Sequence, residues 1–182
     1  MKRKMSIDIF NTTNSLKVLS FLSENPGKEF VNSEIREETS ISRSGIYIAL
    51  RELINQNLVS KTKRGKLLFY SIIYDDSVIR QFKILKNILA LRSLVSKIKP
   101  MAKKIVLYGS TSRGENGPES DIDIFIVSND PDEAKEKIFF IKSKQKIQAV
   151  IKTPSELADF KEGEKVFYAE VDRGIILWED KK

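Results

Sequence analysis

The chain of 182 residues contains no cysteine and no histidine. Without cysteine it has no disulfide, no thiolate metal ligand and no cysteine nucleophile. Without histidine it also lacks the commonest general base and a common zinc ligand. Any catalysis by this sequence therefore depends on carboxylates, hydroxyls, lysine, arginine or a hard metal ion.

The sequence also lacks an uninterrupted apolar run long enough for a membrane helix. The longest apolar-rich stretch, residues 78–98, is broken by five basic residues: Arg80, Lys83, Lys86, Arg92 and Lys97. The first ten residues are basic, but the apolar segment of a secretory signal does not follow them. We therefore expect no membrane association and a cytoplasmic location.

Positive charge is concentrated in the first part of the chain. Residues 1–100 contain 18 basic and 9 acidic residues, a balance of +9, whereas residues 101–182 contain 14 and 16, a balance of −2. The basic part favours a polyanionic partner, and the alternative is a solvated surface of mixed sign. The apolar fraction of 41% predicts globular cores.

Three short helices and a two-stranded hairpin are predicted within residues 12–73. Apolar spacing and capping residues place the helices after Asn14, at 32–39 and from Ser42 onward, and the strands at 58–61 and 67–72. The third helix has an apolar stripe, formed by Ile46, Ala49, Leu50 and Leu53. This order resembles winged helix-turn-helix regulators of the MarR/ArsR kind, and the resemblance implies a DNA-binding domain over residues 1–74.

The third predicted helix carries a polar row opposite its apolar stripe. A recognition helix needs such a row to enter the major groove, where arginine reads guanine and serine contacts phosphate. The tip of the hairpin is basic and suits phosphate or the minor groove. We expect eight residues to bind double-stranded DNA: Ser42, Arg43, Ser44, Tyr47, Arg51, Lys63, Arg64 and Lys66. The alternative is a winged helix used only for protein contacts.

A long helix is predicted over residues 75–99, capped by Asp75 or Asp76 and closed by Pro100. Its apolar residues form two stripes: Val78, Phe82, Leu85 and Leu89 in one, and Ile84, Ile88, Leu91, Val95 and Ile98 in the other. A helix that is apolar on two sides lies between packed partners. These are either the two domains of one chain or two subunits, so the segment is interpreted as a linker and a candidate homodimerisation helix.

The most specific pattern follows this helix. A strand ends in Gly109 and Ser110, and after a polar loop a second strand opens with Asp121 and Asp123 flanking one apolar residue. Alternate residues of a strand face the same side, so the two carboxylates point together. Neighbouring carboxylates repel unless a cation lies between them, and their hard oxygens suit Mg²⁺ or Mn²⁺. The sequence therefore predicts a site for a divalent ion and a phosphorylated ligand.

This pattern resembles the GS…DxD signature of the polymerase-β nucleotidyltransferase superfamily, and the resemblance covers roughly residues 100–180. It implies that Asp121 and Asp123 are catalytic and hold the metal ions. We expect four residues to bind a nucleoside triphosphate: Gly109, Ser110, Arg113 and Ser120. Strands are predicted at 104–108, 122–127, 147–151 and 175–178, and helices at 131–143, 154–160 and 164–171. The expected class is therefore α+β, with a winged helix-turn-helix, a linker helix and a mixed sheet with flanking helices.

One position departs from the superfamily pattern. Active members usually carry a third carboxylate on a later strand, where this sequence has Gln148. An amide cannot accept a proton as a carboxylate does, and it binds metal more weakly. Glu170 or Asp172 would have to substitute from a helix.

Three functions stay open from the sequence. The first is Mg²⁺-dependent transfer of a nucleoside monophosphate to an acceptor hydroxyl by a DNA-binding protein. The second is transcription regulation by a protein whose second domain only senses nucleotide, which the missing carboxylate favours. In the third, that domain binds a protein partner and no nucleotide.

Overall fold

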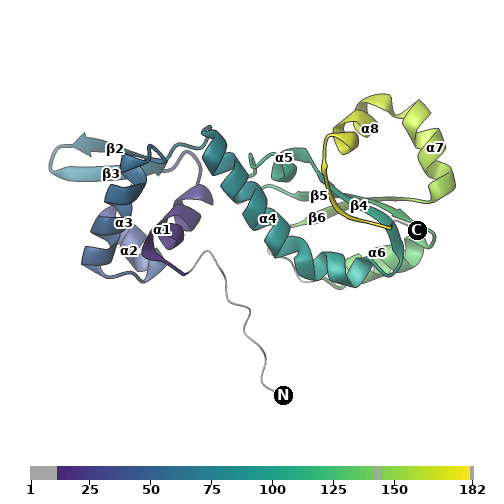
Figure 1. Cartoon of the computed structure of the whole chain (residues 1–182), viewed down its shortest axis with the longest axis horizontal. Helices are drawn as coiled ribbons and strands as arrows, with labels where there is room; N and C mark the ends of the chain where they lie inside the picture. The colour runs from purple at the N-terminus through teal and green to yellow at the C-terminus, as the bar shows by residue number, and fades with distance from the viewer. Residues whose placement is uncertain (1–11, 142, 144, 181–182) are drawn as a thin grey trace, which may run out of the picture. The chain divides into compact units, whose positions relative to one another are not determined.

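A computed structural model describes residues 12–141, 143 and 145–180 (Figure 1). The chain divides into two compact units, residues 1–79 and residues 80–182, and each is described by itself. The first eleven residues of the expected DNA-binding domain lie outside the described residues. Both units mix helices with strands, so the expected α+β class is confirmed. In the described part of the chain, no helix combines the length and hydropathy that a bilayer crossing requires.

The first unit has the element order of a winged helix-turn-helix. Its elements are α1 (Asn14–Ser23), β1 (Phe30–Val31), α2 (Asn32–Thr39), α3 (Arg43–Asn55), β2 (Val59–Arg64) and β3 (Leu67–Ile72). The three strands pair antiparallel in the order β1-β3-β2. The β2–β3 hairpin turns at Gly65, whose φ of 60° lies in the left-handed region that glycine adopts without strain.

The third helix is fixed by its cap and by its apolar side. The Ser42 hydroxyl accepts a hydrogen bond from the backbone N–H of Gly45, which satisfies one of the free amides of the first turn. The predicted stripe is confirmed, because its four residues are at most 4% exposed: Ile46, Ala49, Leu50 and Leu53. Burial of one side of α3 leaves the opposite side facing solvent.

The long helix α4 (Ser77–Ile98) begins in the first unit and runs from Arg80 onward in the second. The Asp76 carboxylate caps it by accepting hydrogen bonds from the N–H groups of Val78 and Ile79. At its other end Leu91, Leu94 and Ile98 are buried in the core of the second unit. Of the first predicted stripe, Val78 and Leu85 are exposed.

The second unit is built on a mixed four-stranded sheet, as expected. Its strands are β4 (Ala102–Tyr108), β5 (Ile122–Ser128), β6 (Ile147–Lys152) and β7 (Ile175–Glu179), in the order β6-β5-β4-β7. Only β5 and β6 are parallel. Its helices after α4 are α5 (Gly109–Ser112), α6 (Pro131–Phe139), α7 (Pro154–Gly163) and α8 (Lys165–Asp172).

Two details of this unit differ from the sequence-based expectation. The residues after Gly109 form the short helix α5 instead of an extended loop. The helix predicted over residues 131–143 ends at Phe139, because Ile141 leaves the helical path and packs against the core of the sheet.

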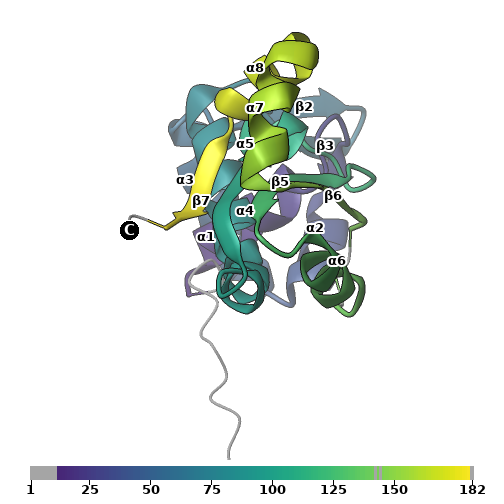
Figure 2. The same cartoon turned by 90° about the vertical axis from the view of Figure 1, so that its right-hand side faces the viewer.

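The sheet of the second unit lies between two helical layers (Figures 1 and 2). On one face, side chains of β4 and β5 such as Leu107 and Ile124 pack with α4 and α6. On the other face, Val106, Tyr108 and Phe125 pack with α7 and α8. Phe160 links α7 to this face, with its ring 5.4 Å from the rings of Phe125 and Phe167. Alternation along β5 therefore places Asp123, two residues before Phe125, on the face covered by α7 and α8.

The glycine after α5 is sterically required, which gives the first prediction. Gly114 has a φ of 69°, and a Cβ there would lie 2.4 Å from the carbonyl oxygen of Arg80 in α4. We expect Gly114→Ala to lower the free energy of unfolding by about 2–4 kcal/mol, from left-handed strain and the clash together. Urea unfolding followed by the fluorescence of Trp178, the single tryptophan, measures this change.

Gly117→Ala is the matched control, because a Cβ at Gly117 would have nothing within 4 Å. We expect it to change the same free energy by less than about 1 kcal/mol. Equal effects of the two substitutions would contradict the packing of Gly114 against α4.

Candidate functional site

The candidate site lies where β4 ends and β5 begins. The antiparallel register pairs Tyr108, the last residue of β4, with Asp123. Gly109 follows with a φ of 69°, and a Cβ on it would lie 2.4 Å from Oδ2 of Asp123. The Asp123 carboxylate therefore lies directly against the backbone of Gly109, where only glycine fits.

Asp121 and Gln148 complete this group of polar side chains. The parallel pairing of β5 with β6 places Gln148 beside Asp123. The Gln148 side-chain amide donates a hydrogen bond to Oδ2 of Asp121. Gln148 thus lies where strand alternation placed it, and its amide donates a hydrogen bond where a carboxylate would accept one.

The electrostatics at this end of the sheet favour a cation. Partial burial raises the pKa of Asp123, the nearby carboxylates of Asp121 and Glu170 raise it further, and Arg113 opposes them. Burial, Asp123 and Glu170 together raise the pKa of Tyr108 to about 12. Both shifts have the sign expected where negative charge accumulates next to partly desolvated groups.

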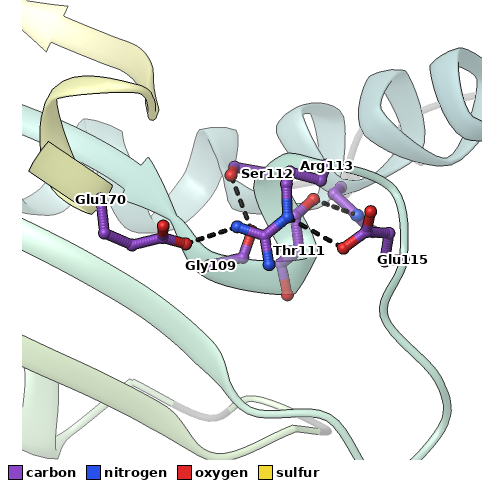
Figure 3. Close-up of polar contacts among 7 residues, drawn as sticks. Gly109, Thr111, Ser112, Arg113, Glu115 and Glu170 are labelled. Carbon is purple, nitrogen blue, oxygen red and sulfur yellow. Dashed lines mark hydrogen bonds and ion pairs between the residues drawn. The ribbon is translucent and has the colours of Figure 1, made fainter.

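Arg113 is the positive group of the site, and two carboxylates hold it (Figure 3). Its Nε lies 2.8 Å from Glu115, and its Nη1 forms an ion pair with Glu170 of α8. These hydrogen bonds raise the pKa of Arg113 further. In this arrangement its guanidinium contacts carboxylates of the chain itself, so binding a triphosphate would require it to exchange them for phosphate oxygens.

Ser110 and Ser120, the two serines expected to bind the nucleotide, both take part in hydrogen bonds within the loop. The Ser110 carbonyl accepts hydrogen bonds from the N–H groups of Arg113 and Glu115. The Ser120 hydroxyl accepts one from the N–H of Gly117, at 2.8 Å, and so closes the turn before Asp121. These contacts shape the loop, and binding of nucleotide by the two hydroxyls stays a prediction.

Two side chains of α4 hold the same loop and were missed by the sequence analysis. The Lys83 ammonium, only 6% exposed, donates a hydrogen bond to the carbonyl of Asn116. The Asn87 amide donates to the carbonyl of Thr111, at 2.9 Å, and to the side chain of Asn116. The available signal was the position of Lys83 within an apolar-rich segment. From the sequence, Lys83 was interpreted only as a break in that segment.

Two other acidic side chains of this unit already have partners within the chain. Among the described residues, no group of three or more acidic side chains has a geometry that would hold a metal ion. Asp130 caps α6 by accepting from the N–H of Glu133, and Glu170 pairs with Arg113. The pair of Asp121 and Asp123 is therefore the candidate for metal binding.

A second candidate surface is the exposed side of α3. Arg43, Tyr47 and Arg51 are exposed, and the Arg51 guanidinium lies 6.0 Å from the centre of the Tyr47 ring. Ser42 caps the helix, and its hydroxyl lies 3.3 Å from that of Ser44. The structure thus brings all five expected α3 residues to one exposed region of the first unit.

The three basic residues expected to bind DNA from the hairpin differ in their contacts. Lys63 and Lys66 are exposed at the turn. Arg64 instead pairs with Glu29, at 2.7 Å, and lies over the ring of Phe69. Its guanidinium therefore stabilises the hairpin against its own unit, whereas the two lysines are available to a partner.

Comparison with known proteins gives one family match, and it lies within the second unit. A family model described as a nucleotidyltransferase domain matches residues 88–174. This segment includes Gly109, Asp121, Asp123 and Gln148. No curated protein matches the chain.

Two solved structures show weak similarity to the chain. NolR from Sinorhizobium fredii has 19% identity and a TM-score of 0.33, over 47% of this chain and 76% of its own. The archaeal chromatin protein TrmBL2, whose structure shows a novel mode of DNA binding, has 15% identity and a TM-score of 0.32, over 86% and 68%. Scores this low support no functional assignment, so the surface of α3 must be judged from its own residues.

Burial of Asp123 and its repulsion by Asp121 give the second prediction. Folding raises the pKa of Asp123. The ionised carboxylate is therefore destabilised in the folded state relative to the unfolded state. We therefore expect Asp123→Asn to raise the melting temperature at pH 7 in the absence of divalent ions. The gain should shrink as the pH falls through the raised pKa of Asp123 and vanish below the ordinary carboxyl pKa of about 4. Thermal unfolding followed by Trp178 fluorescence measures both effects.

Asp159→Asn on α7 is the control. Asp159 is exposed, and its substitution removes the same charge. Its substitution should leave the melting temperature nearly unchanged. If Asp123→Asn lowered the melting temperature at pH 7, burial and repulsion would not be the dominant effects on this carboxylate.

Proposed function

We propose that residues 100–182 bind a nucleoside triphosphate together with Mg²⁺ or Mn²⁺ and transfer its nucleoside monophosphate to an acceptor hydroxyl. The observation that carries this proposal is the pair of Asp121 and Asp123 carboxylates, of which Asp123 lies against the backbone of Gly109. The match of residues 88–174 to the nucleotidyltransferase domain supports it. We further propose three segments with the boundaries expected from the sequence. Residues 1–74 form a DNA-binding domain, residues 75–99 a linker helix, and residues 100–182 the nucleotide-binding domain.

The donor atoms present suit a hard divalent ion. Mg²⁺ is usually held by one or two carboxylates, with substrate phosphates and water completing its octahedron. Asp121 and Asp123 supply two carboxylates, and their mutual repulsion is relieved by a cation. Such an ion would neutralise charge on the phosphates and align the attacking and leaving oxygens.

The residues of the chain then act by binding and orientation. Asp121 and Asp123 orient the triphosphate, and the bare backbone of Gly109 allows it a close approach. Arg113 leaves Glu170 or Glu115 to neutralise phosphate charge. The acceptor oxygen forms a bond to the α-phosphorus, the bond from the α-phosphorus to the bridging oxygen breaks, and pyrophosphate leaves. The proton of the acceptor hydroxyl passes to water.

A second candidate function is nucleotide sensing without transfer. The contact between Gln148 and Asp121 favours it, because an amide occupies the place of the third carboxylate. In this function the nucleotide changes the affinity of the chain for DNA, and no pyrophosphate is released. Measuring the release of pyrophosphate and the affinity for DNA in the same samples separates the two functions.

The proposal for DNA binding depends on the exposed polar row of α3. Arg43, Tyr47 and Arg51 lie on the side opposite the buried stripe, so they are free to reach base edges in a major groove. Lys63 and Lys66 at the hairpin turn would contact phosphate. Arg64 is the weakest member of the expected set, because Glu29 and Phe69 already engage it.

The nucleotide site gives the third prediction. We expect Asp121→Asn to reduce transfer of labelled nucleoside monophosphate by about 100-fold or more, because it removes one of two metal-binding carboxylates. Calorimetric titration of Mg²⁺ with each common nucleoside triphosphate should show weaker binding to the variant. DNA affinity should stay unchanged.

Asp159→Asn serves again as the control of equal charge change and should retain full binding and transfer. Binding without pyrophosphate release in the wild type would select the sensing function. Equal nucleotide binding by wild type and Asp121→Asn would exclude both functions at this site.

The DNA surface gives the fourth prediction. With a mixed-sequence duplex, we expect Arg51→Ala to weaken binding about tenfold, since Arg51 is exposed in the recognition row. Lys66→Ala should lower the slope of log affinity against log salt by about 1, as expected for one lost phosphate contact. Fluorescence anisotropy over a salt series measures both effects.

Arg92→Ala is the matched control, because Arg92 is an exposed arginine of α4 in the other unit. We expect it to leave the affinity and the salt slope unchanged. A similar loss with Arg92→Ala would point to general electrostatic attraction instead of a surface on α3.

A further inference from the structure

The strand β6 forms one edge of the sheet in the second unit. It pairs with β5 from Ile147 to Lys152, and no strand of the described residues pairs with its other side. Natural edge strands are protected by charges, proline, bulges or a covering segment. The five residues from Ile147 to Ile151 carry no charge, no proline and no register shift. The β6 edge is therefore an open template for another strand.

An apolar groove of about 430 Å³ runs beside this edge, between β6 and α6. Ile147, Ala149 and Ile151 alternate along β6 and line it from the strand side. Ile138 and Phe139 line it from α6. These strand residues are only half-buried, and Phe139 is 84% exposed. A strand added beside β6 would place every second side chain on this face of the sheet, next to the groove.

The charged residues at the rim of the groove are basic. Lys135 and Lys146 line it, and none of the described lining residues is acidic. The contact of Lys135 with Asp132 is long, at 3.7 Å, and both side chains are exposed. The groove therefore combines apolar walls with positively charged side chains.

We propose that the β6 edge and this groove, together called the β6 groove, bind an extended acidic peptide segment of another protein. The peptide adds as a fifth strand beside β6. Apolar side chains at its central alternate positions enter the groove. Acidic side chains on the same face, at the alternate positions that flank them, reach Lys135 and Lys146. This proposal is independent of the nucleotide site, because Gln148 lies on the opposite face of β6 from Ile147 and Ala149.

Two other occupants fit the β6 groove less well. A second copy of the chain paired through its own β6 would bring two basic rims together, which like charges disfavour. A nucleic acid would meet the lysines, but it would leave the backbone groups of the strand edge unpaired. The rings of Phe139 and Phe140 also meet edge to face, at 84°, and offer no flat platform for a stack of bases.

The test uses the full chain and a fluorescein-labelled peptide. Valine and isoleucine occupy its central alternate positions, glutamate occupies the alternate positions that flank them on the same face, and serine occupies the positions between. We expect saturable binding in an anisotropy titration. The backbone amides of β6 should also exchange with deuterium at least about tenfold more slowly in the complex, since strand addition pairs them. A peptide of the same charge with proline at its central apolar positions cannot pair along the edge, and it should bind at least about tenfold more weakly.

Two pairs of variants test the surface with matched controls. We expect Lys135→Glu and Phe139→Ser each to weaken peptide binding by about tenfold. Lys165→Glu is the control for charge, because Lys165 of α8 makes an equally long i,i+3 contact of 3.7 Å, with Glu162. Val166→Ser is the control for exposed apolar area, at 89% exposure. All four substitutions are at exposed positions, so folding should be retained.

Several outcomes would overturn the proposal. These are absence of binding, equal binding of the proline peptide, or equal losses in the α8 control variants. Displacement of the peptide by a single-stranded oligonucleotide of the same charge would assign the β6 groove to nucleic acid. A dimer that blocks the peptide would assign it to a second copy of the chain.

Discussion

The antiparallel pairing of β4 with β5 is the interaction on which the candidate nucleotide site depends. It brings the end of one strand beside the start of the next, so Gly109 and Asp123 meet with no space for a side chain between them. The parallel strand β6 then adds Gln148 next to Asp121. Three short segments distant in sequence thus form one cluster because their strands are neighbours in a sheet. A shift of the β4–β5 register by one residue would move Asp123 to the other face.

Features that depend on local sequence could be predicted well. The apolar stripe of α3, its Ser42 cap and the glycine turn of the hairpin follow from spacing and backbone preference within a few residues. The place of Gln148 followed from strand alternation, because β6 contains one polar residue between apolar neighbours. These are properties of a single element, and the sequence of that element contains the necessary information.

Features that depend on contacts between distant elements could not be predicted. Lys83 interrupts an apolar helix in the sequence, but in the structure it is buried because the carbonyl of Asn116 receives its ammonium group. Arg64 belongs to a basic hairpin in the sequence, yet Glu29, 35 residues away, pairs with it. Arg113 is likewise held by Glu170 of α8. In each case the partner is set by the tertiary fold, and single-sequence patterns give no signal for it.

The contacts between α4 and the loop after α5 fix the helical phase of α4. Gly114 packs against the backbone at Arg80, and Lys83 and Asn87, one turn apart, both hold the loop. One residue inserted between Arg80 and Asn87 would rotate the two ends of this segment by roughly 100° relative to each other, so they could not engage the loop together. The chain before Arg80 is under no such constraint from these contacts. Chimeric proteins that exchange the amino-terminal unit should therefore tolerate varied junctions upstream of Arg80 and few within the next two turns.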